Sequence, residues 1–170
     1  RMSWLEFDTE RCSVQRTIGV IGEKWTLLLI RDAANGVHRF DDFRRHVGLS
    51  EAVLADRLRT LVAEGILETR EYREPGQRTR NEYRLTAKGW DLFPVLVALA
   101  QFGDKHLAGD DGRPWEIRHR ECGHVVRAEV RCSHDAAVLT PRDTESVPGP
   151  GAKLLASPEA LAVRETRTKS

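Results

Sequence analysis

The chain has 170 residues, of which 40% are hydrophobic and 31% are charged. A chain of this length is expected to form one compact domain with an appendage, because about 150 residues make up a typical domain. The formal net charge is only +1, so any binding of nucleic acid must depend on the local placement of arginines.

Membrane insertion and secretion are not expected. The longest apolar run, residues 27–30, is much shorter than the roughly 18 residues of a membrane helix. The first residues lack the apolar segment of a signal peptide. Three cysteines are also too few and odd in number for a secreted disulfide scaffold. We therefore expect a cytoplasmic protein that does not contact membranes.

The first half of the chain is predicted to be helical. In residues 11–22, Val14, Ile18 and Ile21 recur at a helical spacing. Residues 24–34 are apolar on nearly all sides, which is typical of a buried helix. A short helix is expected over residues 40–47. Ser50 is a predicted N-cap for the next helix, which extends from 51 to about 64 and ends at Gly65.

The periodicity then changes from helix to strand. Residues 66–72 and 80–85 are predicted strands, and Pro75 and Gly76 between them predict a turn. Thr86 is a predicted cap for a helix over residues 87 to about 107, with Pro94 inside it causing a bend.

The C-terminal part is expected to differ from the helical part. Val126, Ala128 and Val130 alternate with charged residues, which predicts one half-buried strand over residues 124–132. We recognise no internal repeat. The expected domain boundaries are residues 1–109 for a mainly helical domain with a hairpin, 113–147 for a β-containing extension, and 148–170 for a flexible tail.

Two helices followed by a hairpin predict a winged helix-turn-helix, a mainly α fold with a β-hairpin wing (α+β). The helix over residues 51–64 would bury its leucines and present its opposite face to the major groove, and the hairpin tip would reach the minor groove or phosphates. The candidate contacts with double-stranded DNA are Arg39, Ser50, Ala52, Val53, Asp56, Arg57, Arg59, Thr60, Arg73, Gln77, Arg78 and Arg80. A solvated amphipathic helix and an ordinary soluble turn would have the same pattern.

Several motifs make the chain resemble the HxlR-type transcriptional regulators, winged-helix relatives of the MarR group. The resemblance covers residues 11–103. It rests on residues 12–14, 21–32, 39–44, 54–61, 65–67 and 83–89. The chain departs from the family pattern at Ser13, where proline is common, and at Phe102, where tryptophan is usual before Gly103.

The resemblance implies a homodimer formed by the first helix and the long helix after the wing, bound to a roughly palindromic operator. It also implies that the protein regulates transcription, more often as a repressor. The apolar side of the long helix fits such a dimer, although the C-terminal segment could cover the same side. That side includes Val95, Leu96, Leu99, Phe102 and His106.

Cys12 matches the position of a cysteine that senses oxidants or electrophiles in some members of this family. A helix N-terminus favours the reactive thiolate, and Arg11 and Arg16 lie near it in sequence. The alternative interpretation is a small packed residue without a signalling role.

The extension is rich in histidine and cysteine, and Cys122, His124, Cys132 and His134 are candidate zinc ligands. An unbroken strand would hold Cys122 and Cys132 about 33 Å apart, so no metal or other cofactor is expected. The motifs of phosphate-binding loops, nucleophile elbows and zinc deaminases are missing or incomplete, and we do not expect an enzyme. The alternative function is a ligand- or zinc-binding interaction module in the extension that controls DNA binding. A small-molecule effector is a further candidate partner, as gating of the regulator by a small ligand is an option beside thiol oxidation.

Overall fold

The computed structural model describes residues 4–155, which divide into two compact units. One unit contains the residues up to Gly22 and those from Pro141 onwards, and the other is Glu23–Thr140. The part of the expected tail beyond residue 155 lies outside the described residues. None of the helices between residues 4 and 155 has the length and apolar character that a membrane span requires.

In the first unit, the beginning of the chain pairs with a segment near its other end. It contains the 3-10 helix η1 (Trp4–Glu6), helix α1 (Ser13–Ile21) and the 3-10 helix η2 (Pro141–Asp143). The amide of Asp8 donates to the carbonyl of Lys153 at 2.8 Å, and Leu155 donates to Glu6 at 2.8 Å. Residues 153–155, which we expected within the flexible tail, therefore have backbone partners.

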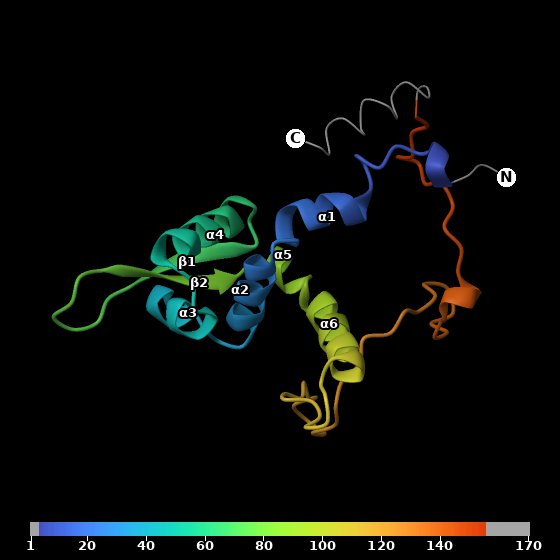
Figure 1. Cartoon of the computed structure of the whole chain (residues 1–170). Helices are drawn as coiled ribbons and strands as arrows, with labels where there is room; N and C mark the ends of the chain where they lie inside the picture. Colours follow the sequence, from blue (N-terminus) through green and yellow to red (C-terminus); the bar gives the residue numbers. More distant parts are fainter. Residues whose placement is uncertain (1–3, 156–170) are drawn as a thin grey trace. The chain divides into compact units, whose positions relative to one another are not determined.

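The second unit is built around three helices, α2 (Lys24–Ala34), α3 (Phe40–Val47) and α4 (Glu51–Ala63) (Figure 1). Their bounds agree with the predicted helices to within one residue. The apolar stripe of each helix faces the other two, because burial of these side chains is the main source of stability. The fully buried apolar side chains of these three helices are those of Leu29, Ile30, Phe43, Leu54, Leu58 and Leu61.

A two-stranded antiparallel hairpin follows the helices. Strand β1 (Leu67–Tyr72) pairs with β2 (Arg80–Leu85), from Leu67 opposite Leu85 to Tyr72 opposite Arg80. The predicted turn is present at the tip, where Gln77 donates to the carbonyl of Glu74 at 3.0 Å and Gly76 has a φ of 75°. Residues before α3 pair with β2, since Tyr83 donates to His38 at 2.8 Å. The predicted α+β winged helix-turn-helix is confirmed.

The prediction of one bent helix over residues 87–107 is wrong. The structure has α5 (Ala87–Trp90), capped by the Thr86 hydroxyl, and a separate helix α6 (Phe93–His106). Pro94 lies in the first turn of α6, where its missing N–H breaks no intrahelical hydrogen bond. Proline therefore begins a helix here and bends none.

The predicted strand over residues 124–132 is also wrong. Residues 116–139 form only isolated bridges, between Arg118 and Val125 and between Arg131 and Val138. The segment is not one continuous strand, because its two ends belong to different short hairpins. Its middle is held by Gln101 of α6, which donates to the carbonyl of Ala128 at 3.2 Å and accepts from its amide.

Candidate nucleic-acid interface

The turn between α3 and α4 sets the direction of α4. Gly48 ends α3 with a φ of 75°, a left-handed conformation that suits glycine. Leu49 is buried and anchors the turn in the core. The hydroxyl of Ser50 accepts from the amide of Val53 at 3.4 Å, so Ser50 is the N-cap, as predicted. Ser50 thus lies at the exposed N-terminus of α4, where amides favour a phosphate.

The face of α4 opposite its buried leucines carries small and polar side chains. Ala52, Val53, Asp56 and Arg59 are exposed, and Thr60 is half-buried. Arg59 forms an ion pair with Asp56 at 3.2 Å, and the Thr60 hydroxyl donates to the Asp56 carbonyl at 3.1 Å. No bulky side chain blocks a close approach to base edges on this face, and Asp56 keeps Arg59 ordered along the helix.

Arg57 lies at the flank of α4 and is 28% exposed. Its guanidinium is 3.3 Å from the Glu23 carboxylate, and its Nε is buried without a hydrogen-bond partner. A residue held in this way has little reach, so it suits a phosphate that approaches the helix and not a base.

The tip of the hairpin presents arginines on an exposed turn. The Arg73 Nε donates to the carbonyl of Gln77 at 3.1 Å, which folds the Arg73 side chain back over the tip. Within residues 4–155, Arg78 forms no ion pair and its side chain is exposed. Arg78 is therefore the wing arginine that can bind a phosphate without first breaking an interaction.

Two other predicted arginines are paired with carboxylates. Arg39 lies 2.7 Å from Glu74 and stacks over the ring of Tyr72, and Arg80 lies 3.6 Å from Asp41. Both pairs are exposed, so each contributes little to stability. They connect the wing to α3 and the segment before it, and they fix the direction in which the arginines point.

A further pair lies along β2, where Arg84 donates to Glu82 at 2.7 Å. This hydrogen bond lowers the pKa of the Glu82 carboxyl below its ordinary value and raises the pKa of Arg84. Both groups stay charged at neutral pH, so Glu82 is a fixed negative charge beside Arg39 at the base of the wing.

Two arginines beside the turn, Arg44 and Arg45, were not among the residues predicted to contact DNA. Arg44 reaches Glu51 at 3.3 Å, which places it next to the N-terminus of α4. Arg45 is highly exposed and pairs with Asp42. Their position in the last turn of a helix that precedes a glycine turn was the signal that could have found them.

Cys12 is the N-cap residue of α1, and its thiol makes no capping hydrogen bond. It is half-buried and lines a hollow of about 1200 Å³. Arg11 and Arg16 line the same hollow, together with residues 145–149 and 151–152. A small reagent that enters the hollow can therefore reach the Cys12 sulfur. The guanidinium groups of Arg11 and Arg16 lie near the position that the reagent would occupy.

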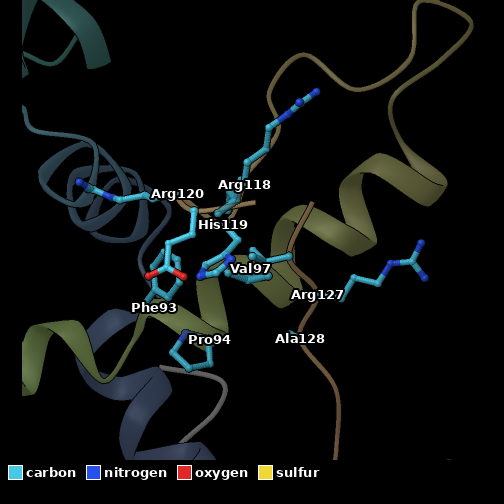
Figure 2. A pocket seen from close by; sticks show the side chains of 11 residues that line it. Phe93, Pro94, Val97, Arg118, His119, Arg120, Arg127 and Ala128 are labelled. Atoms are coloured by element: carbon cyan, nitrogen blue, oxygen red, sulfur yellow. The ribbon is translucent and has the colours of Figure 1, made fainter. Parts of the chain in front are cut away.

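A second cavity, of about 500 Å³, lies between α6 and the segment after it (Figure 2). Phe93, Pro94 and Val97 form its apolar wall, and His119 points toward Val97. Arg118, Arg120 and Arg127 extend away from the centre of the cavity in Figure 2. The cavity thus offers an apolar floor with a polar rim.

The candidate zinc ligands Cys122, His124, Cys132 and His134 do not gather at one point. Within residues 4–155, no three His, Cys, Asp or Glu side chains lie close enough to hold one ion. The ring of His124 contacts the carbonyl of Cys122 at 3.0 Å, and the amide of His134 donates to the Cys132 sulfur at 3.4 Å.

Comparison with known proteins agrees with this geometry. The family model for HxlR-like helix-turn-helix proteins matches residues 20–111. The HTH-type transcriptional regulator Rv3095 of Mycobacterium tuberculosis is 40% identical over 141 residues, which cover 83% of this chain and 88% of the relative. A Bacillus subtilis regulator, YdeP, is 31% identical over 58% of this chain and 77% of its own length.

Solved structures lead to the same family. The crystal structure of PA1607, described as a candidate transcription factor, has a TM-score of 0.74 and 35% identity, covering 82% of this chain and 96% of that one. The redox regulator HypR in its oxidised form has a TM-score of 0.51 and 33% identity, covering 55% and 96%. This chain therefore belongs to the HxlR-like helix-turn-helix family of transcriptional regulators.

Proposed function

We propose that the protein is a homodimeric repressor that binds palindromic promoter DNA. Helix α4 enters the major groove, and the wing tip contacts the neighbouring minor groove or its phosphates. Base contacts come from Ala52, Val53, Asp56, Arg59 and Thr60. Phosphate contacts come from Arg39, Ser50, Arg57, Arg73, Gln77, Arg78 and Arg80, with Arg44 and Arg45 added from the structure.

The observation that carries this proposal is the division of α4 into two faces. Leu54, Leu58 and Leu61 are completely buried, while the opposite face has only small or polar side chains. The acidic residues near it do not leave an uncompensated negative surface, because Asp56 pairs with Arg59 and Glu51 with Arg44. A neutral chain can therefore present cations locally to DNA.

Dimerisation supplies the second half of the contact. Leu99 and Phe102 on α6 are 50% and 59% exposed. Large apolar side chains on one side of a helix are seldom exposed to this extent unless a partner covers them. We assign this side of α6 to the contact with a second copy, together with Val14 and Ile18 of α1. Residues 1–109 would then form the DNA-binding and dimerisation domain, with residues 113–147 as the extension.

Genomic footprinting of the bound sites tests the proposal. A dimer with two recognition helices should protect two half-sites in successive turns of the major groove on one face of the duplex, about 10 base pairs apart from centre to centre. Deletion of the gene should raise transcription from the bound promoters. Protection of a single unpaired half-site, or unchanged transcription, would contradict the proposal.

We further propose that modification of Cys12 releases the DNA. The support is its position at a helix N-terminus, in a hollow that a reagent can enter, beside Arg11 and Arg16. The similar protein HypR is described as a redox regulator. The residues that would transmit the change are those of α1, which we place in the dimer contact.

Alkylation with N-ethylmaleimide tests this role, because the thiolate adds directly to the reagent. The Cys12→Ser variant should keep its DNA affinity after treatment, whereas a Cys122→Ser, Cys132→Ser double variant should lose affinity as the parent does. Equal loss in the Cys12→Ser variant would show that the sensitive group lies elsewhere.

The cavity of Figure 2 supports a second candidate, regulation by a small amphipathic molecule. An apolar wall and a polar rim are typical of effector sites. A thermal-shift screen should find compounds whose stabilisation disappears in Val97→Glu and persists in Cys12→Ser. If no compound raises the midpoint of the parent, or if Val97→Glu keeps the effect, this cavity is not the effector site.

A further inference from the structure

An acidic and a basic side chain lie next to each other on the outward face of α4. Asp56 and Arg59 are both exposed, and they are three positions apart, which places them on one side of the helix. The buried leucines of α4 lie on its other side. Both side chains therefore project toward the major groove when α4 enters it.

The carboxylate of Asp56 is unexpected on a surface that approaches phosphates. Asp56 is the one acidic residue among the proposed base contacts. A carboxylate only accepts hydrogen bonds, and the phosphates of DNA repel it, so it adds to affinity only where the groove offers a donor. The donors in the major groove are the amino groups N4 of cytosine and N6 of adenine. Adenine also presents the acceptor N7 beside its amino group, so a carboxylate fits cytosine better.

The hydrogen bond within the pair leaves one edge of each group open. Nη1 of Arg59 donates to Oδ1 of Asp56 at 3.2 Å. In the part of the chain that the structure describes, Oδ2 of Asp56 accepts from no donor, and Nε and Nη2 of Arg59 have no acceptor. The Thr60 hydroxyl donates to the backbone carbonyl of Asp56 and so does not occupy the carboxylate. Asp56 thus orients Arg59 while both side chains keep groups available for a base.

The order of donors and acceptors along the pair matches the edge of a C·G base pair. In the major groove such a base pair presents the acceptors N7 and O6 of guanine and then the donor N4 of cytosine. O6 and N4 are joined by a base-pairing hydrogen bond and lie about 2.9 Å apart. The Arg59 donor and the Asp56 acceptor lie at a similar distance, 3.2 Å. One side-chain pair can therefore face one base pair, with each donor opposite an acceptor.

The neighbouring side chains allow the close approach that such a contact requires. The side chain of Asp56 is short, so it reaches a base only if the helix lies near the base edges. Ala52 and Val53 in the preceding turn and Thr60 in the following one are all small. The ion pair thus extends further from the helix than its neighbours on this face.

We propose that each half-site of the operator contains a C·G base pair that Asp56 and Arg59 recognise together. Arg59 donates to N7 and O6 of the guanine, and Asp56 accepts from N4 of the cytosine. This recognition rests on the proposed function, because it assigns bases to a helix placed in the major groove. Where the base pair is T·A, the Asp56 carboxylate faces O4 of thymine, another acceptor, and repels it. Asp56 therefore selects for C·G and against other DNA.

Selection of bound duplexes from a random pool tests the assignment. The parent should enrich palindromic sites with one C·G pair fixed in each half. Replacement of that pair by T·A should weaken binding by about 5- to 150-fold. Asp56→Ala and Arg59→Ala should each lose most of this preference, which is a ratio of two affinities and does not depend on the folded fraction of a variant. Asp56→Ala should also bind a shuffled duplex at least as tightly as the parent, because the repelling charge is gone.

A modified base separates a direct contact from an effect of DNA shape. A duplex with 7-deazaguanine at the fixed position lacks N7 and keeps its base pairing. The parent should bind it about 5-fold or more weakly, whereas Arg59→Ala should not distinguish the two duplexes. Glu129→Ala and Arg131→Ala are matched controls, because they remove an exposed ion pair outside α4. Both controls should keep the preference of the parent.

Three results would overturn the proposal and leave the proposed function standing. They are enriched half-sites without a fixed C·G pair, a C·G preference that either variant keeps in full, and equal affinity of the parent for the 7-deazaguanine duplex. If the parent enriches no sequence at all, the proposed function fails, and the recognition of C·G fails with it.

Discussion

The Nδ1 of His46 lies 2.6 Å from Oδ2 of Asp32, and the other oxygen of this carboxylate accepts two hydrogen bonds from Arg31. Asp32 belongs to α2 and is 2% exposed, whereas His46 belongs to α3. One buried carboxylate thus connects the first helix of the helix-turn-helix to the helix beneath it.

Replacement of Asp32 should destabilise the protein more than replacement of His46. Asp32→Ala removes all three hydrogen bonds and should lower the free energy of unfolding by about 1–3 kcal/mol. His46→Ala leaves the Arg31 contacts intact and should cost about 1 kcal/mol. Urea denaturation followed by circular dichroism measures both free energies. An equal loss in the two variants would contradict a stabilising contribution from the Arg31 hydrogen bonds to Asp32.

Thr86 joins the base of the wing to α5. Its hydroxyl accepts from the Gly89 amide at 3.1 Å and donates to the Gly65 carbonyl at 2.6 Å. Thr86→Ala should therefore cost about 1–2 kcal/mol, whereas Thr86→Ser keeps the hydroxyl and should cost much less. The urea midpoints of the two variants provide the comparison, and indistinguishable midpoints would contradict the capping role.

Gly89 leaves no room for a side chain. A Cβ at this position would lie 2.3 Å from the Ile66 carbonyl oxygen, whereas a Cβ at Gly103 would meet nothing within 4 Å. We expect Gly89→Ala to lower the thermal midpoint strongly. Gly103→Ala, in the interior of α6, should raise stability by up to about 1 kcal/mol. Calorimetry measures the thermal midpoints of both variants. A Gly89→Ala variant with the midpoint of the parent would contradict the close packing at Gly89.

The exposed side of α6 should be needed for dimerisation. Leu99→Asp places a charge in the proposed contact and should shift the protein to monomers, with loss of operator binding, while the thermal midpoint of the helix-turn-helix unit changes little. Val147→Asp, at another exposed apolar residue, is the control. Light scattering measures the molar mass, and a dimeric Leu99→Asp variant would exclude this side of α6 from the contact.

Arg59 and Thr60 should determine sequence preference. Because their side chains lie on the outward face of α4, Arg59→Ala and Thr60→Ala should reduce affinity for the operator by about 1–3 kcal/mol and change affinity for unrelated DNA much less. Competition binding with a shuffled duplex measures the ratio. A uniform loss on both duplexes would assign these residues to phosphates.

Local sequence signals were sufficient for the helix-turn-helix and the wing. Ser50 as a cap, the buried leucines of α4 and the Pro75–Gly76 turn each fix a conformation within a few residues, and the structure has them as predicted. The ion pairs of Arg57 with Glu23 and of Arg39 with Glu74 join residues that are distant in sequence. Their partners depend on tertiary packing, which periodicity does not report.

The extension was predicted poorly for a related reason. Val126 and Val130 do alternate with charged residues, but they pair with different partners, Ile117 and Leu139. The reverse turn at Ala136 has no glycine or proline to mark it, because side-chain and backbone contacts hold it. The two short hairpins of the extension share a backbone hydrogen-bond pattern but few residue types, so their similarity is difficult to recognise from the sequence.

The dependence of DNA affinity on salt tests the central claim most directly. Arg78 is exposed and forms no ion pair within residues 4–155, so Arg78→Ala should weaken binding to all sequences and reduce the slope of log affinity against log salt by about one. Arg113→Ala, outside the helix-turn-helix and the wing, should leave both unchanged. An Arg78→Ala variant with the affinity and slope of the parent would contradict the placement of the wing on DNA.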